Sequence, residues 1–335
     1  MKACFFANAP MDLIEKVEFY KNDIRILREL GFEVKVANKL MNIPWGCDIY
    51  FAWWASSGAK ALIASKILRK PCFLVVGGSD VSLKDRSPAG YYKRNFLHKI
   101  IIKWTLRNAD AILAISKDSF EDAVLLGAKR IHLVYLSIDT EKYSPKRVKR
   151  QDTALIVSHL SKQNIERKGI KDIIKAMKIV AKINSRAKLF IIGKKLEGYP
   201  EVLDLTKKLG LEKNVIFCGM VGEKEKINFY NISKVFVSPS EHEGFGVAIG
   251  EAMACGLPVI VTARGAIPEV AGRAGIYVPL NDVGAIAEAI IKVIENPNLR
   301  KDLSKKSREQ IMKFSLQRRR DEIKKIIEPF IKKAH

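Results

Sequence analysis

Short runs of apolar residues alternate with amphipathic stretches along nearly all of the 335-residue chain. The apolar runs are continuous rather than alternating with polar residues, which is typical of strands that helices cover on both faces. The stretches between them repeat apolar residues at helical spacing. The expected strands are 2–8, 33–37, 48–51, 72–76, 111–115 and 132–136 in the first half, and 154–157, 188–192, 215–217, 235–237 and 259–262 in the second.

This alternation predicts an α/β protein with two doubly wound, Rossmann-like domains. The basic segment KYSPKRVKR (142–150) separates two complete series of strands and helices. The chain is also long enough for two domains with full-sized cores. Ligands of such sheets bind at the carboxyl ends of the strands, so we expect the site in a central cleft that the two domains face.

The composition excludes several classes of protein. The apolar share of 48% is enough to bury a core, which argues against a disordered chain. No apolar run reaches the roughly 18 residues of a membrane span, and the N-terminus lacks the pattern of a signal peptide, so we expect a cytoplasmic protein. The five cysteines and five histidines are scattered, which predicts neither disulfide bonds nor a metal site.

The net charge of the chain is strongly positive. Lys and Arg number 59 against 36 Asp and Glu, a formal net charge of +23. Such an excess favours anionic partners, namely nucleic acid, phosphorylated ligands or an acidic membrane surface. The basic residues are densest in 66–107 and 300–335, so neither half is a dedicated basic domain. An ordinary solvated, lysine-rich surface explains the charge equally well at this point.

The segment KVFVSPSEHEGFGVAIGEAMACGLPVIVTARGAIPEVAG (234–272) carries the most specific chemistry. A predicted strand leads through a polar turn to Gly244-Phe245-Gly246, and a helix follows. Glycines at a helix start let backbone N–H groups approach an anion, and the helix dipole favours negative charge there. The segment therefore predicts a phosphate cradle.

Two carboxylates flank this cradle. Glu251 lies in a helix of small apolar residues, so we expect it to be buried, and a buried carboxylate is costly unless it has a partner. Glu243 lies at the mouth of the cradle. The alternative is purely structural: Glu251 pairs with an arginine, and Glu243 complements the helix N-terminus.

The spacing of Glu243 and Glu251 inside EGFGVAIGEAMACGLPVIVTARGAIPEV is similar to the E-x7-E signature of glycosyltransferase family 4, the glycosyl transferases group 1. That family consists of retaining enzymes of the GT-B fold that use nucleotide-sugar donors. The resemblance covers nearly the whole chain. It continues through IVSHLSKQNIERKGIKDIIKAMK, AKLFIIGKK and NVIFCGMVGEKEKINFYNISKVFVSPS, and more loosely through PCFLVVGGSD, NADAILAIS and YLSIDTEKYSP.

The resemblance implies an order of domains and a set of site residues. The implied parts are an N-terminal acceptor-binding domain (1–145), a linker (146–152), a C-terminal nucleotide-sugar-binding domain (153–312) and a C-terminal helix (313–335) that packs back on the N-terminal domain. Glu251 would accept hydrogen bonds from the ribose hydroxyls, Glu243 would face the sugar hydroxyls, and Lys168 would neutralise the leaving diphosphate. The remaining implied donor contacts are Arg167, His159, Gly244, Phe245, Gly246, Val247, Met220 and Val221.

The same resemblance implies the donor and the absence of a cofactor. The implied donor is a UDP- or GDP-linked sugar. No metal or other cofactor is implied, and the D-x-D motif of the other large glycosyltransferase fold does not occur in the chain. For a retaining reaction, the family implies that the departing phosphate takes the proton of the acceptor.

The C-terminal half departs from the family pattern at two positions. The usual Gly-Arg-Leu after its first strand is Ser158-His159-Leu160. A histidine cannot form the bidentate contact of an arginine with phosphate, so either Arg167 replaces the charge or phosphate binding is weaker. The usual Gly-Gly of GGIPEV is Gly265-Ala266, which predicts a stiffer loop.

The N-terminal half offers candidates for the acceptor side but lacks two family features. DIYFAWWASS has no catalytic-site histidine, and ANAPMD is no Gly-rich loop. Asp80 follows a predicted strand, and it either orients the acceptor hydroxyl, as a third catalytic residue, or caps a helix. Trp53 and Trp54 either stack on a sugar or pack the core.

Residues 92–107, YKRNFLHKIIIKWTLR, predict a helix with an apolar stripe, and Ile102 and Leu106 fall on its opposite, cationic side. Apolar side chains exposed among cations suit an anionic membrane surface. One hypothesis is therefore peripheral binding to the inner membrane face, with a lipid-linked or membrane-associated acceptor. The alternative is a core helix on which Ile102 and Leu106 contact a protein partner.

The leading interpretation is a retaining glycosyltransferase that moves a sugar from a nucleotide-sugar donor to an acceptor in glycan or glycolipid synthesis. One alternative is a nucleotide-sugar epimerase of the same fold, which would convert the donor with no acceptor present. The other is a basic nucleic-acid-binding protein, although the chain contains no recognised nucleic-acid module.

Overall fold

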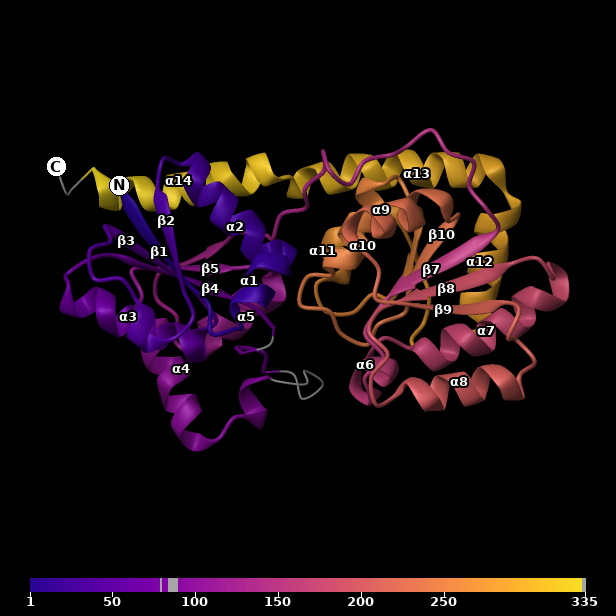
Figure 1. Ribbon diagram of the computed structural model, residues 1–335, viewed down its shortest axis with the longest axis horizontal. Helices are drawn as coiled ribbons and strands as arrows, with labels where there is room; N and C mark the ends of the chain where they lie inside the picture. The colour runs from indigo at the N-terminus through magenta and orange to yellow at the C-terminus, as the bar shows by residue number, and fades with distance from the viewer. Residues whose placement is uncertain (79, 84–89, 333–335) are drawn as a thin grey trace. The chain divides into compact units, whose positions relative to one another are not determined.

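The structure is a computed structural model that describes residues 1–78, 80–83 and 90–332. The chain divides into two compact units: Met1–Ser137 together with the residues from Phe314 onward, and Ile138–Lys313. Each unit has its own parallel sheet with helices on both faces (Figure 1). Residues 138–145 thus group with the second unit, and the C-terminal helix groups with the first.

The sheet of the first unit has the strand order β2-β1-β3-β4-β5-β6, with every neighbouring pair parallel. Its strands are β1 (Lys2–Phe6), β2 (Glu33–Ala37), β3 (Ile49–Trp53), β4 (Cys72–Val76), β5 (Ala111–Ala114) and β6 (Ile131–Leu133). Its helices are α1 (Met11–Lys16), α2 (Glu18–Glu29), α3 (Ala55–Ile67), α4 (Phe96–Asn108), α5 (Lys117–Leu125) and α14 (Leu316–Ile331), with short 3-10 turns η1 (Leu40–Asn42) and η2 (Tyr91–Lys93).

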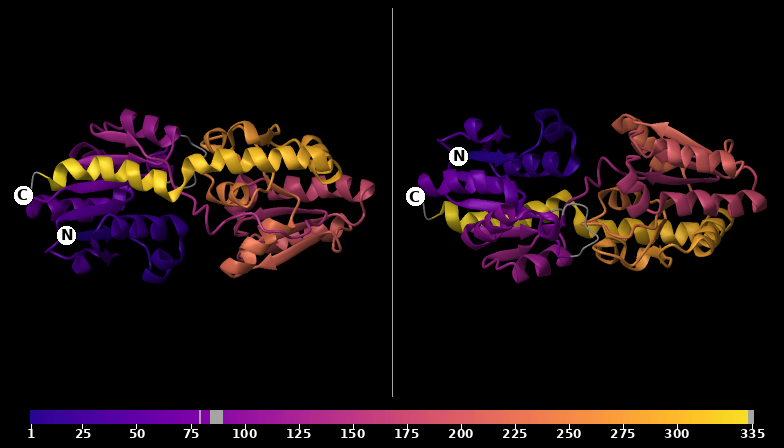
Figure 2. Two further views of the ribbon diagram at one scale, coloured as in Figure 1. Left: turned by 90° about the horizontal axis from the view of Figure 1, so that it is seen from above. Right: turned by 90° about the horizontal axis from the view of Figure 1, so that it is seen from below.

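Helices cover both faces of this sheet, as the continuous apolar runs predict. All residues of β3 and β4 are buried. Leu74 of β4 shares a core with Ile102 and Leu106 of α4. On the other face, the ring of Phe73 meets the ring of Phe330 of α14, with centroids 5.3 Å apart. Figures 1 and 2 show α2 and α14 on one side of the sheet and α3 and α4 on the other.

A buried ion pair fastens α14 to the first unit. Arg319 Nε lies 2.6 Å from Asp23 Oδ1, and Arg319 Nη2 lies 2.8 Å from Asp23 Oδ2. The same guanidinium donates to the carbonyls of Val134 and Tyr135, and Trp53 Nε1 donates to the carboxylate of Asp23. Asp23 and Arg319 are both buried, so either one alone would be an uncompensated charge in the core.

The predicted orientation of the helix in 92–107 is wrong. Ile102 and Leu106 are 0% exposed, whereas Phe96 of the apolar stripe is 78% exposed. The helix also begins later, at Phe96, after the turn η2. The physical reason is that α4 carries apolar residues around most of its circumference, and the narrow side with Ile102 and Leu106 is the one that meets β4 and β5.

The sheet of the second unit has the order β12-β11-β10-β7-β8-β9, again with parallel pairs. Its strands are β7 (Thr153–Val157), β8 (Lys188–Ile192), β9 (Val215–Gly219), β10 (Val235–Ser238), β11 (Val259–Val261) and β12 (Gly275–Tyr277). Its helices are α6 (Lys162–Arg167), α7 (Ile170–Ile183), α8 (Tyr199–Lys208), α9 (Glu223–Ile232), α10 (Val247–Ala254), α11 (Ile267–Ala271), α12 (Val283–Glu295) and α13 (Pro297–Ile311), with 3-10 turns η3 (Gly272–Ala274) and η4 (Met312–Phe314).

The second unit confirms the predicted strands and adds β12. Its main core packs α7 and α12 against the sheet. The three residues of β12 include a glycine, and so short a run gives no strand signal. Because all the strands are parallel, the loops that follow β7, β8, β9 and β10 emerge at one edge of the sheet.

We predict that Asp23→Ala lowers the unfolding free energy of the first unit by about 3–5 kcal/mol, because it leaves Arg319 buried and unpaired. All four tryptophans lie in this unit, so tryptophan fluorescence during urea unfolding reports it. The control is Glu29→Ala, which removes the half-exposed pairs with Arg25 and Arg320 and should cost less than about 1 kcal/mol. Equal losses in the two variants would contradict the assigned role of the buried pair.

Candidate active site

A tight contact between two loops builds the site at the carboxyl edge of the second sheet. Arg167 ends α6, Lys168 and Gly169 form the turn to α7, and this segment packs against the loop that follows β10. The amide of Glu241 donates to the carbonyl of Arg167 at 2.8 Å. Gly169 has a φ of +62°, and a Cβ at this position would lie 3.0 Å from Pro239 Cγ. The absence of a side chain at Gly169 therefore allows Arg167 and Lys168 to lie close to the loop that follows β10.

Glu243 lies between these two cations. Its Oε1 is 2.9 Å from Lys168 Nζ, and its Oε2 is 3.3 Å from Arg167 Nη1. Ser240 Oγ donates to the same carboxylate at 3.1 Å. Burial opposes the ionisation of Glu243, but Lys168 and Arg167 outweigh it and lower the pKa of the carboxyl to about 2. The structure thus brings three of the predicted site residues together in a cluster with one net positive charge.

The guanidinium of Arg167 is held in a fixed orientation. Nη1 donates to the carbonyl of His242 at 2.7 Å, and Nη2 donates to Asn164 Oδ1 at 3.1 Å. A cation that is already oriented loses little freedom when an anion arrives. Arg167 is therefore suited to bind the phosphate that the family's missing arginine would bind.

His159 cannot supply that charge. Its Nδ1 accepts a hydrogen bond from the amide of Lys194 at 3.0 Å, so this nitrogen carries no proton. Partial burial and the nearby Lys168 and Lys194 also lower the pKa of the imidazole. His159 is neutral near pH 7, and it can offer a single donor through Nε2.

Glu251 is buried, as predicted, at 3% exposure. Lys226 Nζ lies 2.9 Å from its Oε1, and the hydroxyl of Tyr230 donates to its Oε2 at 2.8 Å. Burial and the adjacent carboxylate raise the pKa of Tyr230. Glu251 thus binds a lysine and a tyrosine, and not the structural arginine of the alternative interpretation. Sequence reasoning missed Lys226 and Tyr230, although their four-residue spacing on α9 places them on one helix face.

The predicted cradle forms the start of α10. Gly246 precedes the helix with a φ of +92°, a conformation that favours glycine, and Val247 is the first helical residue. Phe245 is buried beside it. Gly244 completes the turn. Gly246 provides no side-chain cap, and the N–H groups of a first helical turn have no partner within the helix, an arrangement that favours an anion there.

The Gly265-Ala266 departure introduces no backbone strain. Gly265 has a φ of +54°, and a Cβ there would lie 2.6 Å from the carbonyl oxygen of Glu243. Ala266 has a φ of −81° and donates its amide to the same carbonyl at 3.0 Å. The first glycine of the family's pair is thus the one that the close approach requires, and alanine fits the second position.

Met220 and Val221 lie in the turn after β9, at the same edge of the sheet. Gly219, the last residue of β9, has a φ of +71°. The side chain of Met220 is exposed and that of Val221 is half-buried. This turn offers backbone groups to a ligand at the edge rather than a charged side chain.

Asp80, Trp53 and Trp54 lie in the first unit. Asp80 is 1% exposed, its Oδ2 accepts from the amide of Ala55 at the start of α3, and its Oδ1 accepts from the amide of Gly77. Burial raises the pKa of Asp80 to about 7. This geometry favours the alternative that Asp80 caps a helix. The helix it caps is α3, which precedes Asp80 in the chain. Trp53 is buried in the core, and Trp54 Nε1 donates to the hydroxyl of Tyr20.

The described residues include neither a cluster of metal ligands nor a membrane-spanning helix. In residues 1–78, 80–83 and 90–332, no three His, Cys, Asp or Glu side chains gather in a way that could hold a metal ion. In the same part of the chain, no helix combines the length and apolar character needed to cross a membrane.

Comparison with known proteins identifies the family. Residues 138–310, more than half of the chain, match the family described as Glycosyl transferases group 1. The chain belongs to this family. The matched residues include Glu243, Glu251, Lys168 and Arg167, so the clustered side chains lie inside the family's shared region. The predicted family is confirmed.

Two curated relatives illustrate the similarity. The chain is 28% identical over 224 residues to the N-acetyl-alpha-D-glucosaminyl L-malate synthase of Bacillus anthracis, covering 63% of this chain and 57% of that protein. It is 32% identical over 200 residues to the capsular polysaccharide biosynthesis glycosyltransferase CapM of Staphylococcus aureus, covering 59% and 52%. The chain thus matches just over half the length of these relatives.

Solved structures share the fold over the full chain. The complex of Anabaena Alr3699/HepE with UDP has a TM-score of 0.78 and 18% identity, covering 98% of this chain and 100% of that chain. The sucrose-phosphate synthase from Thermosynechococcus elongatus has a TM-score of 0.76 and 17% identity, covering 99% of both. The predicted GT-B fold is confirmed.

Proposed function

We propose that this chain is a retaining glycosyltransferase that moves a sugar from a nucleotide-sugar donor to an acceptor in glycan or glycolipid synthesis. The observation that carries the proposal is the pair of carboxylates on either side of the start of α10. Glu243 is paired with Lys168 and Arg167, and Glu251 is held by Lys226. The first cluster offers cations to a diphosphate, and the second offers a carboxylate to a ribose.

The diphosphate of the donor takes over the cations that Glu243 neutralises. A diphosphate carries more negative charge than one carboxylate, so Lys168 and Arg167 attract it more strongly than they attract Glu243. The released Glu243 then faces the hydroxyls of the donor sugar. The amides of Phe245 and Gly246 add hydrogen bonds to the phosphate at the start of α10. No metal is needed for this charge balance, and we keep the expectation that no cofactor is required.

The nucleoside binds at Glu251. Each carboxylate oxygen accepts more than one hydrogen bond, so the ribose hydroxyls can bind beside Lys226 and Tyr230. The backbone of Met220 and Val221 would contact the base. The proposed donor is a UDP- or GDP-linked sugar. The structures of Alr3699/HepE, which are described as complexes with UDP and with UDP-glucose, support the UDP-linked donor.

Transfer with retention needs a proton acceptor on the face where the leaving group departs. The bond from the anomeric carbon to the diphosphate oxygen breaks, the bond to the acceptor oxygen forms, and the departing phosphate takes the proton of the acceptor. Lys168 stabilises the charge that develops on the phosphate. The first unit binds the acceptor, and Asp80 acts there as a positioning residue that holds the start of α3.

We predict that Glu251 contributes to binding of the nucleoside and that Lys168 contributes to binding of the phosphates. The measurement is calorimetry with UDP, GDP and inorganic pyrophosphate. Glu251→Gln should weaken binding of the preferred nucleoside diphosphate about tenfold or more and leave pyrophosphate unchanged, because hydrogen bonds to a charged group contribute about 1.5–3 kcal/mol. Lys168→Ala should weaken binding of both ligands. The matched control is Glu309→Gln, an exposed carboxylate of α13 in the same unit.

Two outcomes would count against the proposal. If no nucleoside diphosphate binds the folded wild-type chain, the nucleotide-sugar site is wrong. If NMR of the donor shows conversion into its epimer with no acceptor present, the epimerase alternative replaces transfer.

The surface of the first unit supports a membrane-associated acceptor. We define the apolar face as the exposed apolar residues of α3, η2 and α4, which are Ile63, Ile67, Tyr92, Phe96, Leu97, Ile100 and Trp104. Residues 55–70 and 90–108 contain nine Lys or Arg, namely Lys60, Lys66, Arg69, Lys70, Lys93, Arg94, Lys99, Lys103 and Arg107, and no Asp or Glu. Cations around exposed apolar side chains favour an anionic lipid surface, with about 1 kcal/mol from each Lys or Arg near it. We propose that the protein works in the cytoplasm, at the inner membrane face.

We predict that the protein floats with vesicles that contain phosphatidylglycerol but not with phosphatidylcholine vesicles, and that salt weakens this binding. The double variant Phe96→Asp/Leu97→Asp should lose at least fivefold in vesicle binding. Ile183→Asp, an equally drastic change at a 59% exposed position of the second unit, is the matched control. Binding that ignores lipid charge, or equal losses in both variants, would rule out this face as the docking surface.

A further inference from the structure

The two carboxylate oxygens of Glu251 have different surroundings. Oε2 accepts a hydrogen bond from the hydroxyl of Tyr230, which is 0% exposed, so this oxygen faces the interior of the second unit. Oε1 lies 2.9 Å from the ammonium of Lys226, whose side chain is 21% exposed, whereas the side chain of Glu251 is only 4% exposed. Lys226 is thus the more exposed of the two partners, and a ligand that reaches the carboxylate from solvent meets this lysine as well.

The ammonium of Lys226 is held in place and keeps donors for a ligand. Its Nζ lies 5.2 Å from the centroid of the ring of Tyr143, which is 1% exposed. That ring meets the ring of Tyr230 edge-on, with centroids 6.2 Å apart. The cation–π contact with a buried ring limits where the ammonium can lie. An ammonium has three N–H donors, and the hydrogen bond to Glu251 uses one of them.

A vicinal diol fits this carboxylate and this ammonium together. A hydroxyl both donates and accepts hydrogen bonds, so a ribose hydroxyl can donate to Glu251 and accept from Lys226 at the same time. Hydrogen bonds with charged partners are stronger than those between neutral groups. A hydroxyl that uses both partners is therefore bound more tightly than one that uses the carboxylate alone.

We propose that Lys226 binds a ribose hydroxyl of the donor together with Glu251, and that this pair selects nucleotides with an intact vicinal diol over deoxynucleotides. The assignment rests on the proposed function, and it narrows the donor to a ribonucleotide-linked sugar. A deoxynucleotide leaves the buried pair without one of its hydrogen-bonding partners, and a site built to bind a hydroxyl rejects the analogue that lacks it. Lys226 is then a specificity-determining residue of the donor site.

The test compares UDP or GDP, whichever binds the full-length wild type more tightly, with its two deoxy forms, each of which lacks one ribose hydroxyl. Calorimetry should show that at least one deoxy form binds the wild type about tenfold or more weakly. Lys226→Met keeps most of the side-chain length but cannot donate, so it should reduce this penalty about threefold or more. Inorganic pyrophosphate should bind Lys226→Met within about twofold of the wild type, which checks that the second unit is folded.

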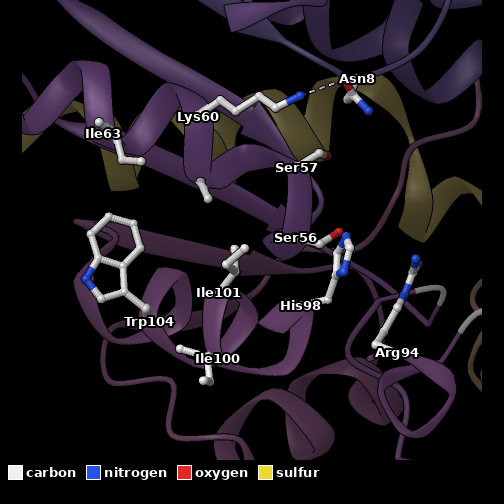
Figure 3. A pocket seen from close by; sticks show the side chains of 11 residues that line it. Asn8, Ser56, Ser57, Lys60, Ile63, Arg94, His98, Ile100, Ile101 and Trp104 are labelled. Carbon is white, nitrogen blue, oxygen red and sulfur yellow. Dashed lines mark hydrogen bonds between the residues drawn. The ribbon is translucent and has the colours of Figure 1, made fainter. Parts of the chain in front are cut away.

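Two other lysine-to-methionine changes serve as matched controls. Lys224→Met alters an exposed lysine of the same helix, α9. Lys60→Met alters a lysine that lines a pocket of about 600 Å³ in the first unit, where its Nζ donates to Asn8 Oδ1 at 3.2 Å (Figure 3). Both variants should keep the nucleotide affinities of the wild type within about twofold. An effect of Lys60→Met as large as that of Lys226→Met would place the nucleoside in the first unit and overturn the assignment.

A double variant separates contact with the ligand from a role in holding Glu251. Lys226→Met alone leaves a buried carboxylate without its cation, whereas Glu251→Gln/Lys226→Met removes both charges and avoids this cost. If Lys226 contacts the hydroxyl, the double variant should show a smaller penalty for the deoxy form than Glu251→Gln alone. Equal penalties in these two variants would mean that Lys226 acts only through Glu251, which overturns the assignment.

The wild type separates this assignment from the proposed function. If it binds the ribonucleotide and both deoxy forms equally well, the nucleotide site stands and selection of the diol is wrong. If the penalty for the deoxy form is the same in Lys226→Met as in the wild type, the role of Lys226 is wrong. If the wild type binds none of these nucleotides, the proposed function fails together with the assignment.

Discussion

A carboxylate that is withdrawn from water needs a cation or hydrogen-bond donors beside it, and this constraint organises the second unit. Glu243 and Glu251 stand on either side of the start of α10, and each is held by a lysine from a different element. The glycines at 169 and 265 allow the loops to approach closely enough for the first of these pairs. The same pairing stabilises the two loops and holds Lys168 and Arg167 in the place where we propose that the diphosphate of the donor binds.

In the first unit, the buried carboxylate of Asp23 is also paired with a cation, whereas two surface helices carry cations and no acidic residue. Asp23 and Arg319 satisfy each other in the core and tie α14 to the unit. On the opposite side of the sheet, α3 and α4 place cations and apolar side chains together with no acidic residue in either helix. Exposed apolar side chains among like charges are unfavourable in water, and contact with an anionic lipid surface would relieve both. The large positive charge of the chain is therefore concentrated in part where an anionic surface would meet it.

The sequence alone predicted every strand except β12, the burial of Glu251 and the family, because these depend on local patterns. It did not predict the partners of Glu251, since Lys226 and Tyr230 reach it from another helix through tertiary packing. It also assigned the wrong side of α4 to the core, because a helix with apolar residues around most of its circumference has no unique buried face. The sequence left open whether His159 or Arg167 supplies the phosphate-binding charge. The hydrogen bond from the Lys194 amide to His159 Nδ1 depends on tertiary structure, which no spacing in the sequence reveals.

We propose that Glu243 and the donor diphosphate compete for the same two cations, Lys168 and Arg167. The most direct test is calorimetric titration of UDP into wild-type protein and Glu243→Gln, with sugar transfer followed in parallel. Gln keeps the shape of the side chain and removes the competing charge, so UDP should bind the variant several-fold more tightly while transfer slows. Weaker or unchanged UDP binding to a folded Glu243→Gln variant would contradict the claim.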